Sequence, residues 1–368
     1  MSKMINQMTI LQKPFVNFTI AKFIIRFVTP KLWGRSGHVQ TAIYGALKHP
    51  SLTRRSAQRI LLPLADGSTS SFDLFEPIDQ HQSGHDITLV LTPGITNSSE
   101  SNYIKTCVHH ALDHGFRCAA LNHIGVLASE QVTGNRIFNY GMIDELEAMM
   151  DYLGENYPKM FFITIGFSMG ANQTTLYLLR TPKERRPRLL MGMSICQGYS
   201  ATVSMPMYHD WMQGRRFYNQ MIAENVKRLL RRNYATVVAP HVKSGRLDEG
   251  KLWASSSIAA LDENYNRRVV DRPSLDDFYN WCSCLPHLEK LDLPMIFLNT
   301  DDDPVIPAEL FEPVQKMCEE RDDMAFVRTK HGGHLGFLEG DSFSPSSITW
   351  LDKFIVEAAN RAISTYAH

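Results

Sequence analysis

Short apolar runs alternate with longer stretches of helical periodicity along most of this chain, and that alternation narrows the choice of fold sharply. It extends from about residue 86 to residue 196 and resumes from 294 to 365. Parallel strands that are covered by helices on both faces appear in a sequence as short, nearly continuous apolar runs. The sequence therefore predicts a mostly parallel central sheet between two helical layers. The predicted strands are 86–94, 117–123, 159–168, 188–196, 294–300 and 324–329, and the predicted helices are 102–115, 143–157, 171–180, 307–319 and 347–365.

The alternation stops between residues 199 and 285, where the chain is rich in Arg, Tyr, Met and Trp and reads mostly as helices. We interpret this segment as an insertion at one end of the sheet, where a lid is usually placed. Upstream, two strand-like runs flank Asp66-Gly67, which predicts a β-hairpin. The predicted organisation is an N-terminal segment (1–31), a first part of the core (32–198), a helical lid (199–285) and a second part of the core (286–368).

The pentapeptide Gly-Phe-Ser-Met-Gly at residues 166–170 lies between a predicted strand and a predicted helix. This is the context of a nucleophile elbow, in which a serine occupies a strained turn at the end of a strand. The residues two positions before and after that serine must be small, because side chains there would strike the neighbouring strand and helix. The motif makes Ser168 a candidate nucleophile. The alternative is a glycine-rich tight turn with a solvated serine.

A serine hydroxyl is a poor nucleophile unless a base takes its proton. In folds with this elbow the order along the chain is serine, acid, histidine. Asp301, Asp302 and Asp303 follow one downstream strand, and His331 and His334 follow the next. Loops at the carboxyl ends of strands are where such sheets place their sites. The alternatives are a solvated turn with a helix N-cap for the acids and an ordinary loop position for each histidine.

Within these loops we favour Asp303, which precedes Pro-Val-Ile-Pro, and His334, whose flanking glycines let the loop fold tightly over the serine. His334 would then remove the proton of Ser168 while Asp303 orients the imidazole. The resulting oxyanion needs backbone N–H donors, and we expect them at Met169 and Ile95. This chemistry requires no metal and no other cofactor, and we find no Walker or Rossmann loop for a nucleotide.

The overall composition fits this class of enzyme. Apolar residues make up 44% of the 368 residues and the formal net charge is zero. A neutral chain argues against a nucleic-acid binder, which would show a basic excess. The six cysteines are scattered without a Cys-x-x-Cys pair. We interpret them as core thiols rather than as a disulfide framework or a zinc site.

Residues 14–29 form an apolar stretch that carries two cations. On a helical wheel Thr19, Lys22 and Arg26 share one stripe and the rest is almost entirely apolar. Sixteen residues make roughly 24 Å of helix. A helix that spans a bilayer needs about 20 residues, so this stretch is shorter than a spanning helix. The pattern predicts a helix that lies in a membrane interface or serves as a short anchor. The alternative is a helix packed on the surface of the protein itself.

Several longer stretches resemble the group-2 acylglycerol lipases of the alpha/beta-hydrolase domain-containing family. The matching stretches are "LWGRSGHVQTAIYG" (32–45), "DGSTSSFDLFEP" (66–77), "CAALNHIG" (118–125), "GFSMGAN" (166–172), "SICQGYSA" (194–201), "RRFYN" (215–219) and "HGGHLGFLEG" (331–340). The resemblance implies an alpha/beta-hydrolase fold and hydrolysis of monoacylglycerols such as arachidonoylglycerol at a membrane. By position it implies the triad Ser168, Asp303 and His334.

The same resemblance implies an N-terminal signal-anchor that attaches the protein to the plasma membrane or the endoplasmic reticulum, and a steroid ligand that stimulates the lipase. Two other hypotheses stay open. The first is a broader carboxylesterase or triacylglycerol lipase, or an acyltransferase that passes the acyl group to an alcohol. The second is a steroid- or lipid-binding receptor on the same fold, against which the intact serine, acid and histidine argue.

Overall fold

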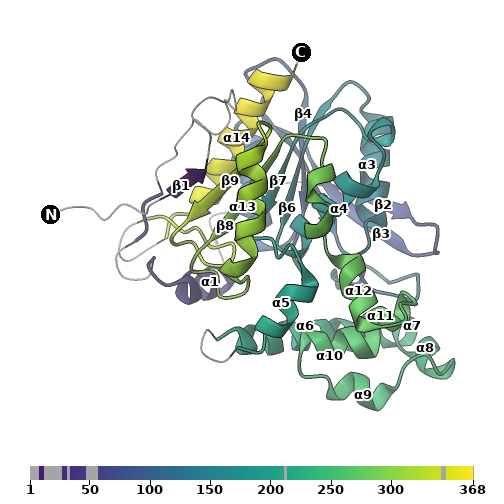
Figure 1. Ribbon diagram of the computed structural model, residues 1–368. Coiled ribbons are helices and arrows are strands. Elements are labelled where there is room, and N and C mark those ends of the chain that lie inside the picture. The colour runs from purple at the N-terminus through teal and green to yellow at the C-terminus, as the bar shows by residue number, and fades with distance from the viewer. Residues whose placement is uncertain are drawn as a thin grey trace.

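The computed structural model describes residues 8–11, 27–30, 34–46, 57–210, 214–340 and 345–367. Within these residues nine strands form one sheet in the order β1-β9-β8-β7-β6-β4-β5-β3-β2 (Figure 1). The strands β4 to β9 pair in parallel, whereas β1, β2 and β3 pair antiparallel at the edges. The predicted mostly parallel sheet is therefore confirmed. The strand bounds are β1 (Met8–Leu11), β2 (Gln58–Pro63), β3 (Thr69–Phe75), β4 (Ile87–Thr92), β5 (Arg117–Asn122), β6 (Phe161–Phe167), β7 (Leu189–Ile195), β8 (Met295–Thr300) and β9 (Met324–Thr329).

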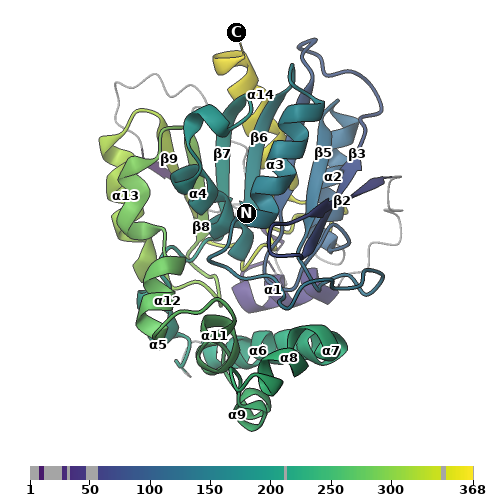
Figure 2. The same cartoon turned by 90° about the vertical axis from the view of Figure 1, so that its right-hand side faces the viewer.

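Helices cover both faces of the sheet (Figures 1 and 2). On one face pack α2 (Asn102–Asp113) and α14 (Trp350–Tyr366), and on the other α3 (Asp144–Asn156), α4 (Met169–Arg180) and α13 (Phe311–Glu320). Side chains alternate between the two faces along each strand. In β4, for example, Leu89 and Leu91 join the first apolar cluster and Val90 joins the second. This double burial explains why the central strands read as continuous apolar runs.

The structure confirms the predicted strands and helices of the core to within a few residues, and it confirms the hairpin at Asp66-Gly67, whose strands pair from Gln58↔Leu74 to Pro63↔Thr69. The sequence pattern does not predict β1, α1 (Gly37–Ala46) or the short 3-10 helices η2 (Lys183–Arg185) and η4 (Leu285–Lys290). The first part of the helix predicted over 307–319 is a short 3-10 turn, η5 (Ala308–Leu310), and α13 itself begins at Phe311.

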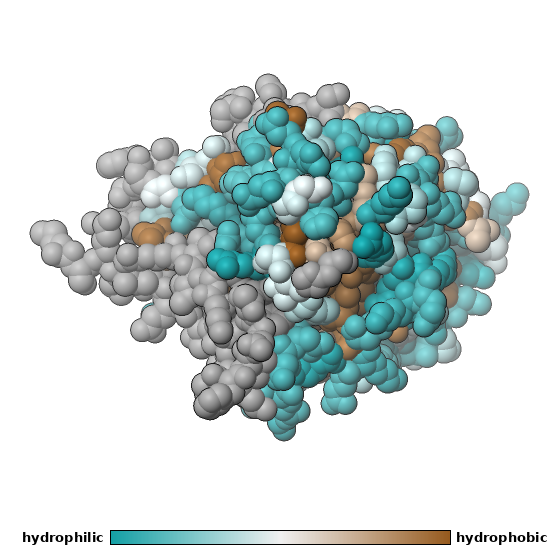
Figure 3. Space-filling model, turned by 90° about the horizontal axis from the view of Figure 1, so that it is seen from above, coloured by the Kyte–Doolittle hydropathy of each residue, from teal (hydrophilic) through white to brown (hydrophobic). Residues whose placement is uncertain are grey.

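A group of helices between β7 and β8 forms a separate layer, which we call the cap (residues 201–282). It lies beyond the end of the sheet, next to α1, in both views (Figures 1 and 2). Among the described residues seen at the end of the molecule away from the cap, most are hydrophilic, with apolar residues in a band between them (Figure 3). The cap consists of α5 (Ala201–Met207), α6 (Arg215–Arg232), α7 (Tyr234–Val237), α8 (Ala239–Lys243), α9 (Glu249–Ala254), α10 (Ile258–Leu261), the π-helical turn η3 (Asp262–Asn266), α11 (Arg267–Val269) and α12 (Leu275–Cys282).

The N-terminal segment differs from its prediction at one end. Most of the helix predicted over 14–29 lies outside the described residues, but residues 27–30 are described and are not helical. Phe27 is buried and its ring lies 5.2 Å from that of Trp350, so it belongs to the core of the protein. The predicted interfacial or anchoring helix therefore does not include residues 27–29, and the rest of that prediction lies outside the described residues. None of the described helices combines the length and the apolar character needed to cross a bilayer.

Candidate active site

Ser168 occupies the sharp turn between β6 and α4. Its backbone is in a positive-φ conformation, φ 55° and ψ −115°, which a residue with a side chain adopts only under local strain. A Cβ on Gly166 would come within 2.3 Å of the Gly170 carbonyl oxygen, and one on Gly170 within 2.0 Å of the Thr92 carbonyl oxygen. Both contacts are far too short for real atoms. The predicted steric reason for the two glycines is therefore confirmed.

The structure brings the three predicted polar residues into one hydrogen-bonded chain. His334 Nε2 lies 2.8 Å from Ser168 Oγ, and His334 Nδ1 lies 2.8 Å from Asp303 Oδ2. Because a carboxylate only accepts, the ring proton belongs on Nδ1, which leaves Nε2 free to accept the serine proton. The Asp303 side chain is fully shielded from solvent, whereas 13% of the His334 side chain is exposed. The arrangement is suited to moving a proton from serine to histidine.

The second carboxylate oxygen of Asp303 is also hydrogen-bonded. Its Oδ1 accepts hydrogen bonds from the backbone N–H groups of Val305, at 2.7 Å, and Ile306, at 2.9 Å. These bonds close the turn after Asp303. The alternative of a solvated helix N-cap is wrong, because Asp303 is buried and the helical elements that follow have Pro307 and Leu310 at their N-caps. The neighbouring Asp302 pairs with His331 instead, at 3.1 Å. Burial raises the pKa of Asp302, although hydrogen bonds from Gly333 N–H and His331 act against this.

The loop that carries His334 rests on α1, which the sequence analysis did not anticipate. The His334 N–H donates to Thr41 Oγ1 at 2.8 Å, and Thr41 Oγ1 donates in turn to the Gly37 carbonyl at 2.7 Å. Gln40 is fully buried and its Oε1 accepts from Leu338 N–H at 2.9 Å. Gly37, Gln40 and Thr41 lie in the stretch 32–45, one of the stretches that carry the family resemblance. Their residue types alone give no signal of a role.

The two predicted oxyanion donors lie in the same cavity as the serine. Met169 and Ile95 both line it together with Ser168. Met169 is the first residue of α4, where a helix leaves its N–H groups unpaired. The preceding N–H, that of Gly94, is already used, because it donates to Tyr103 Oη at 2.7 Å. This leaves Ile95 as the candidate donor from the loop after β4.

The cavity beside Ser168 lies between the core and the cap, and its wall is mainly apolar. The apolar lining residues come from the β4 loop, the elbow, α5, α6, α10 and the Asp303 turn: Ile95, Met169, Ala201, Met205, Ile222, Ile258, Val305 and Ile306. Polar side chains are fewer and include Tyr140, Asn172 and Tyr208. Such a wall suits an apolar chain better than a charged ligand.

One further group near the serine has the residue types of a metal site. Cys196, Asp303 and His334 each place one potential ligand atom within 4.8 Å of the others. Burial, assisted by the nearby Asp303 carboxylate, raises the pKa of the Cys196 thiol. A metal ligand must be the thiolate, which this environment disfavours, and both nitrogens of His334 already have partners. The residues are therefore better suited to proton transfer than to metal binding.

Comparison with known proteins defines the class. A family model described as alpha/beta hydrolase fold matches residues 87–341. Esterase Pf2001 of Pyrococcus furiosus superimposes with a TM-score of 0.52 at 14% identity, covering 94% of this chain and all of that one, which supports the fold alone. The protein is an alpha/beta hydrolase.

Relatives define the family more narrowly. Abhydrolase domain-containing protein 2 of Drosophila melanogaster is 40% identical over 331 residues, covering 90% of this chain and 83% of the relative. Monoacylglycerol lipase ABHD2 of Homo sapiens is 38% identical over 338 residues, covering 91% and 79%. The chain belongs to the ABHD2 family, and it is a carboxylic ester hydrolase.

Proposed function

We propose that Ser168, His334 and Asp303 form the catalytic triad of this hydrolase. The observation that carries the proposal is the continuous chain of two 2.8 Å hydrogen bonds from Ser168 Oγ through the imidazole to the Asp303 carboxylate. His334 takes the serine proton as Oγ attacks the ester carbonyl, and Asp303 stabilises the imidazolium that results. The same imidazolium then protonates the departing alcohol. Water, activated in the same way, hydrolyses the acyl-enzyme.

The negative oxygen that develops during attack requires donors on the other side of the carbonyl. We assign this role to the N–H groups of Met169 and Ile95, which flank Ser168 in the cavity. Donors fixed before the reaction stabilise the developing charge without reorganising, and loss of one typically costs about 100- to 1000-fold in rate.

For the substrate we propose monoacylglycerol esters, including arachidonoylglycerol. Two observations support this. The cavity beside Ser168 has a mainly apolar wall, which suits a fatty acyl chain. The relatives from Mus musculus and Homo sapiens carry the name monoacylglycerol lipase. Water would release fatty acid and glycerol.

We further propose that the protein works at a membrane surface, the plasma membrane or the endoplasmic reticulum. Val203 on α5 and Phe217 and Met221 on α6 are exposed apolar side chains. The same two helices supply Met205 and Ile222 to the wall of the cavity. Apolar surface therefore adjoins the elements that line the site, as is useful for an enzyme that takes its substrate from a bilayer. The N-terminal segment would add a second attachment.

The decisive experiment is a panel of monoacyl-, diacyl- and triacylglycerols assayed with the wild type and with Ser168→Ala. We expect monoacylglycerols to be hydrolysed fastest and the variant to be inactive on all of them. Faster turnover of triacylglycerols or of short soluble esters would favour a broader lipase or carboxylesterase. An added acceptor alcohol that diverts the product into a new ester would favour an acyltransferase.

The receptor hypothesis is tested with a fluorophosphonate that labels active serine hydrolases. We expect labelling of the wild type and none of Ser168→Ala. An unlabelled wild type that still binds steroid or lipid would favour a receptor on this fold.

A further inference from the structure

The peptide group between Pro93 and Gly94, just before the proposed oxyanion donor, is hydrogen-bonded to a side chain on each side. Its carbonyl oxygen accepts a hydrogen bond from His123 Nε2 at 2.8 Å. Its N–H donates to Tyr103 Oη at 2.7 Å. The carbonyl and N–H of a trans peptide point in opposite directions, so the two side chains oppose any rotation of the peptide plane.

Both of these side chains are buried. Tyr103 lies on α2, and its ring packs 5.1 Å from that of Phe167, the residue before the nucleophile. His123 is 1% exposed and follows the end of β5. Its second nitrogen, Nδ1, lies 3.4 Å from Glu145 Oε2. A backbone carbonyl only accepts, so the proton on Nε2 is required.

The next two peptides are fixed by the loop itself. The Gly94 carbonyl accepts from Asn97 N–H at 3.1 Å, and the Ile95 carbonyl accepts from Asn97 Nδ2 at 2.8 Å. The Gly94 carbonyl and the Ile95 N–H belong to one peptide and point in opposite directions. The turn therefore holds the peptide that carries the Ile95 N–H from its C-terminal side, and the Pro93–Gly94 peptide adjoins it on its N-terminal side. Thr96, inside this turn, has a positive φ of 60°.

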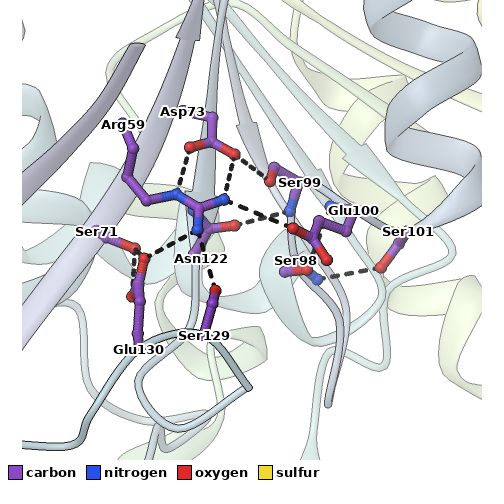
Figure 4. Close-up of polar contacts among 10 residues, drawn as sticks. All are labelled: Arg59, Ser71, Asp73, Ser98, Ser99, Glu100, Ser101, Asn122, Ser129 and Glu130. Atoms are coloured by element: carbon purple, nitrogen blue, oxygen red, sulfur yellow. Dashed lines mark hydrogen bonds and ion pairs between the residues drawn. The ribbon is translucent and has the colours of Figure 1, made fainter. Parts of the chain in front are cut away.

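The far end of the loop is anchored to the edge of the sheet (Figure 4). Ser99 Oγ donates to Asp73 Oδ2 at 2.5 Å, and Ser99 N–H donates to Asn122 Oδ1 at 2.9 Å. Asp73 is buried on β3 and is held by two hydrogen bonds from Arg59, at 2.7 Å and 2.9 Å. The loop is therefore tied at both ends, and the Tyr103 and His123 contacts are the ones that act on the Pro93–Gly94 peptide.

We propose that Tyr103 and His123 are positioning residues for catalysis: together they lock the Pro93–Gly94 peptide and so aim the Ile95 N–H at the oxyanion. The proposal rests on the proposed function, since it presumes attack by Ser168. Neither side chain lines the cavity, in contrast to Ile95. Their effect is expected in the transition state, where the oxyanion exists, and not in binding of the neutral ester.

Tyr103→Phe removes a single hydroxyl and so tests the hydrogen bond between Tyr103 Oη and the Gly94 N–H. The aromatic contact with Phe167 is kept. On a soluble p-nitrophenyl ester we expect kcat to fall about tenfold, part of the 100- to 1000-fold that loss of an oxyanion donor costs, with KM changed by less than about twofold. The rate of fluorophosphonate labelling should fall in parallel. Tyr265→Phe is the matched control, because Tyr265 is also buried and its hydroxyl donates to a backbone carbonyl, that of Val237.

His123 offers a test by rescue. The amide nitrogen of glutamine can take the place of Nε2, so His123→Gln should keep kcat within about threefold of the wild type, whereas His123→Leu, which lacks a donor, should lose tenfold or more. Melting temperatures identify any variant that is merely unfolded. If His123→Leu does not fold, His123→Gln alone still tests the requirement for a donor at this position.

The proposal is overturned if Tyr103→Phe matches Tyr265→Phe in kcat, if the loss is confined to KM, or if Gln and Leu at position 123 are equally impaired. Ser168→Ala separates this failure from failure of the triad. If Ser168→Ala stays active, the proposed function is wrong; if it is inactive while Tyr103→Phe is normal, only the positioning role is wrong.

Discussion

Asp303 and His334 are joined by a 2.8 Å hydrogen bond between Oδ2 and Nδ1, and the opposite nitrogen of the same imidazole reaches Ser168 Oγ. Asp302, one residue before Asp303, and His331, three residues before His334, form a similar pair at 3.1 Å. The two pairs share residue types and sequence neighbourhood. Only the first continues to the serine, so only the first can pass a proton.

This difference predicts unequal effects of the same substitution at adjacent positions. Asp303→Asn removes the acceptor that fixes the His334 tautomer, and we expect kcat to fall by roughly 1000- to 10,000-fold. Asp302→Asn, the matched control, keeps an oxygen for Gly333 N–H and should reduce kcat by less than about tenfold. Steady-state kinetics on one ester decide the matter, and equal losses would refute the assignment of Asp303.

The contact between α1 and the histidine loop gives a second prediction. Thr41→Val keeps the shape of the side chain but leaves the His334 N–H without its acceptor, at a cost of about 1–3 kcal/mol. We expect a lower melting temperature and a kcat reduced about tenfold as the imidazole loses its fixed position. Thr41→Ser restores the hydroxyl and should recover most of both. If the valine variant has normal kcat, the contact supports folding only.

The central strands, their helices, the elbow and the residues of the Ser168–His334–Asp303 hydrogen-bonded chain could be predicted from the sequence, because each depends on local pattern or on the order of the fold. Gly166 and Gly170 could be explained from the sequence, since a helix and a neighbouring strand approach these two positions in any elbow of this kind. A Cβ on Gly166 would meet the helix start at Gly170 and Ala171, and one on Gly170 would meet the end of β4 at Thr92. Thr41, Tyr103 and His123 could not be explained in this way. Each makes a hydrogen bond to a backbone group in another part of the fold, and neither periodicity nor spacing predicts such a contact. β1 escaped for a similar reason, because a four-residue strand is defined by its partner, β9.

The elbow predicts a strong dependence of stability on glycine. A methyl group on Gly170 would meet the carbonyl oxygens of Thr92 at 2.0 Å and Pro93 at 2.4 Å, both backbone atoms that cannot swing away. We expect Gly170→Ala to lower the free energy of unfolding by more than about 4 kcal/mol, or to prevent folding. Gly45→Ala in α1 is the control, because no atom lies within 4 Å of its added Cβ. It should be neutral or stabilising by up to about 1 kcal/mol.

A buried carboxylate in the cap predicts a pH dependence of stability. Asp262 is fully buried in the π-helical turn, where it accepts hydrogen bonds from Tyr279 Oη at 3.1 Å and Asn266 Nδ2 at 2.7 Å. Burial raises its pKa to about 7. In the unfolded chain the pKa is about 3.9, so between about pH 4 and pH 7 the folded state holds a proton that the unfolded state has lost.

Through this group the free energy of unfolding therefore falls as pH rises through that window, by at most about 1.4 kcal/mol per pH unit, and levels off above pH 7. Asp262→Asn cannot titrate. We expect the melting temperature of the variant, relative to the wild type, to rise steadily from pH 4 to pH 7. Parallel melting curves across the window would show that Asp262 stays charged in the folded protein.

The proposed membrane face predicts that apolar side chains on α6 contribute to binding of lipid vesicles. Phe217 and Met221 stand one helical turn apart and are 60% and 43% exposed. Within α6 the charged residues are six arginines and lysines and a single glutamate, which favours an anionic surface. Phe217→Asp combined with Met221→Asp should weaken sedimentation with anionic vesicles and slow hydrolysis of vesicle-borne monoacylglycerol, while leaving kcat on a soluble ester unchanged. Leu61→Asp is the matched control, since Leu61 is also 60% exposed but lies on β2, away from the cap. Equal effects of the two changes would exclude α6 as the docking face.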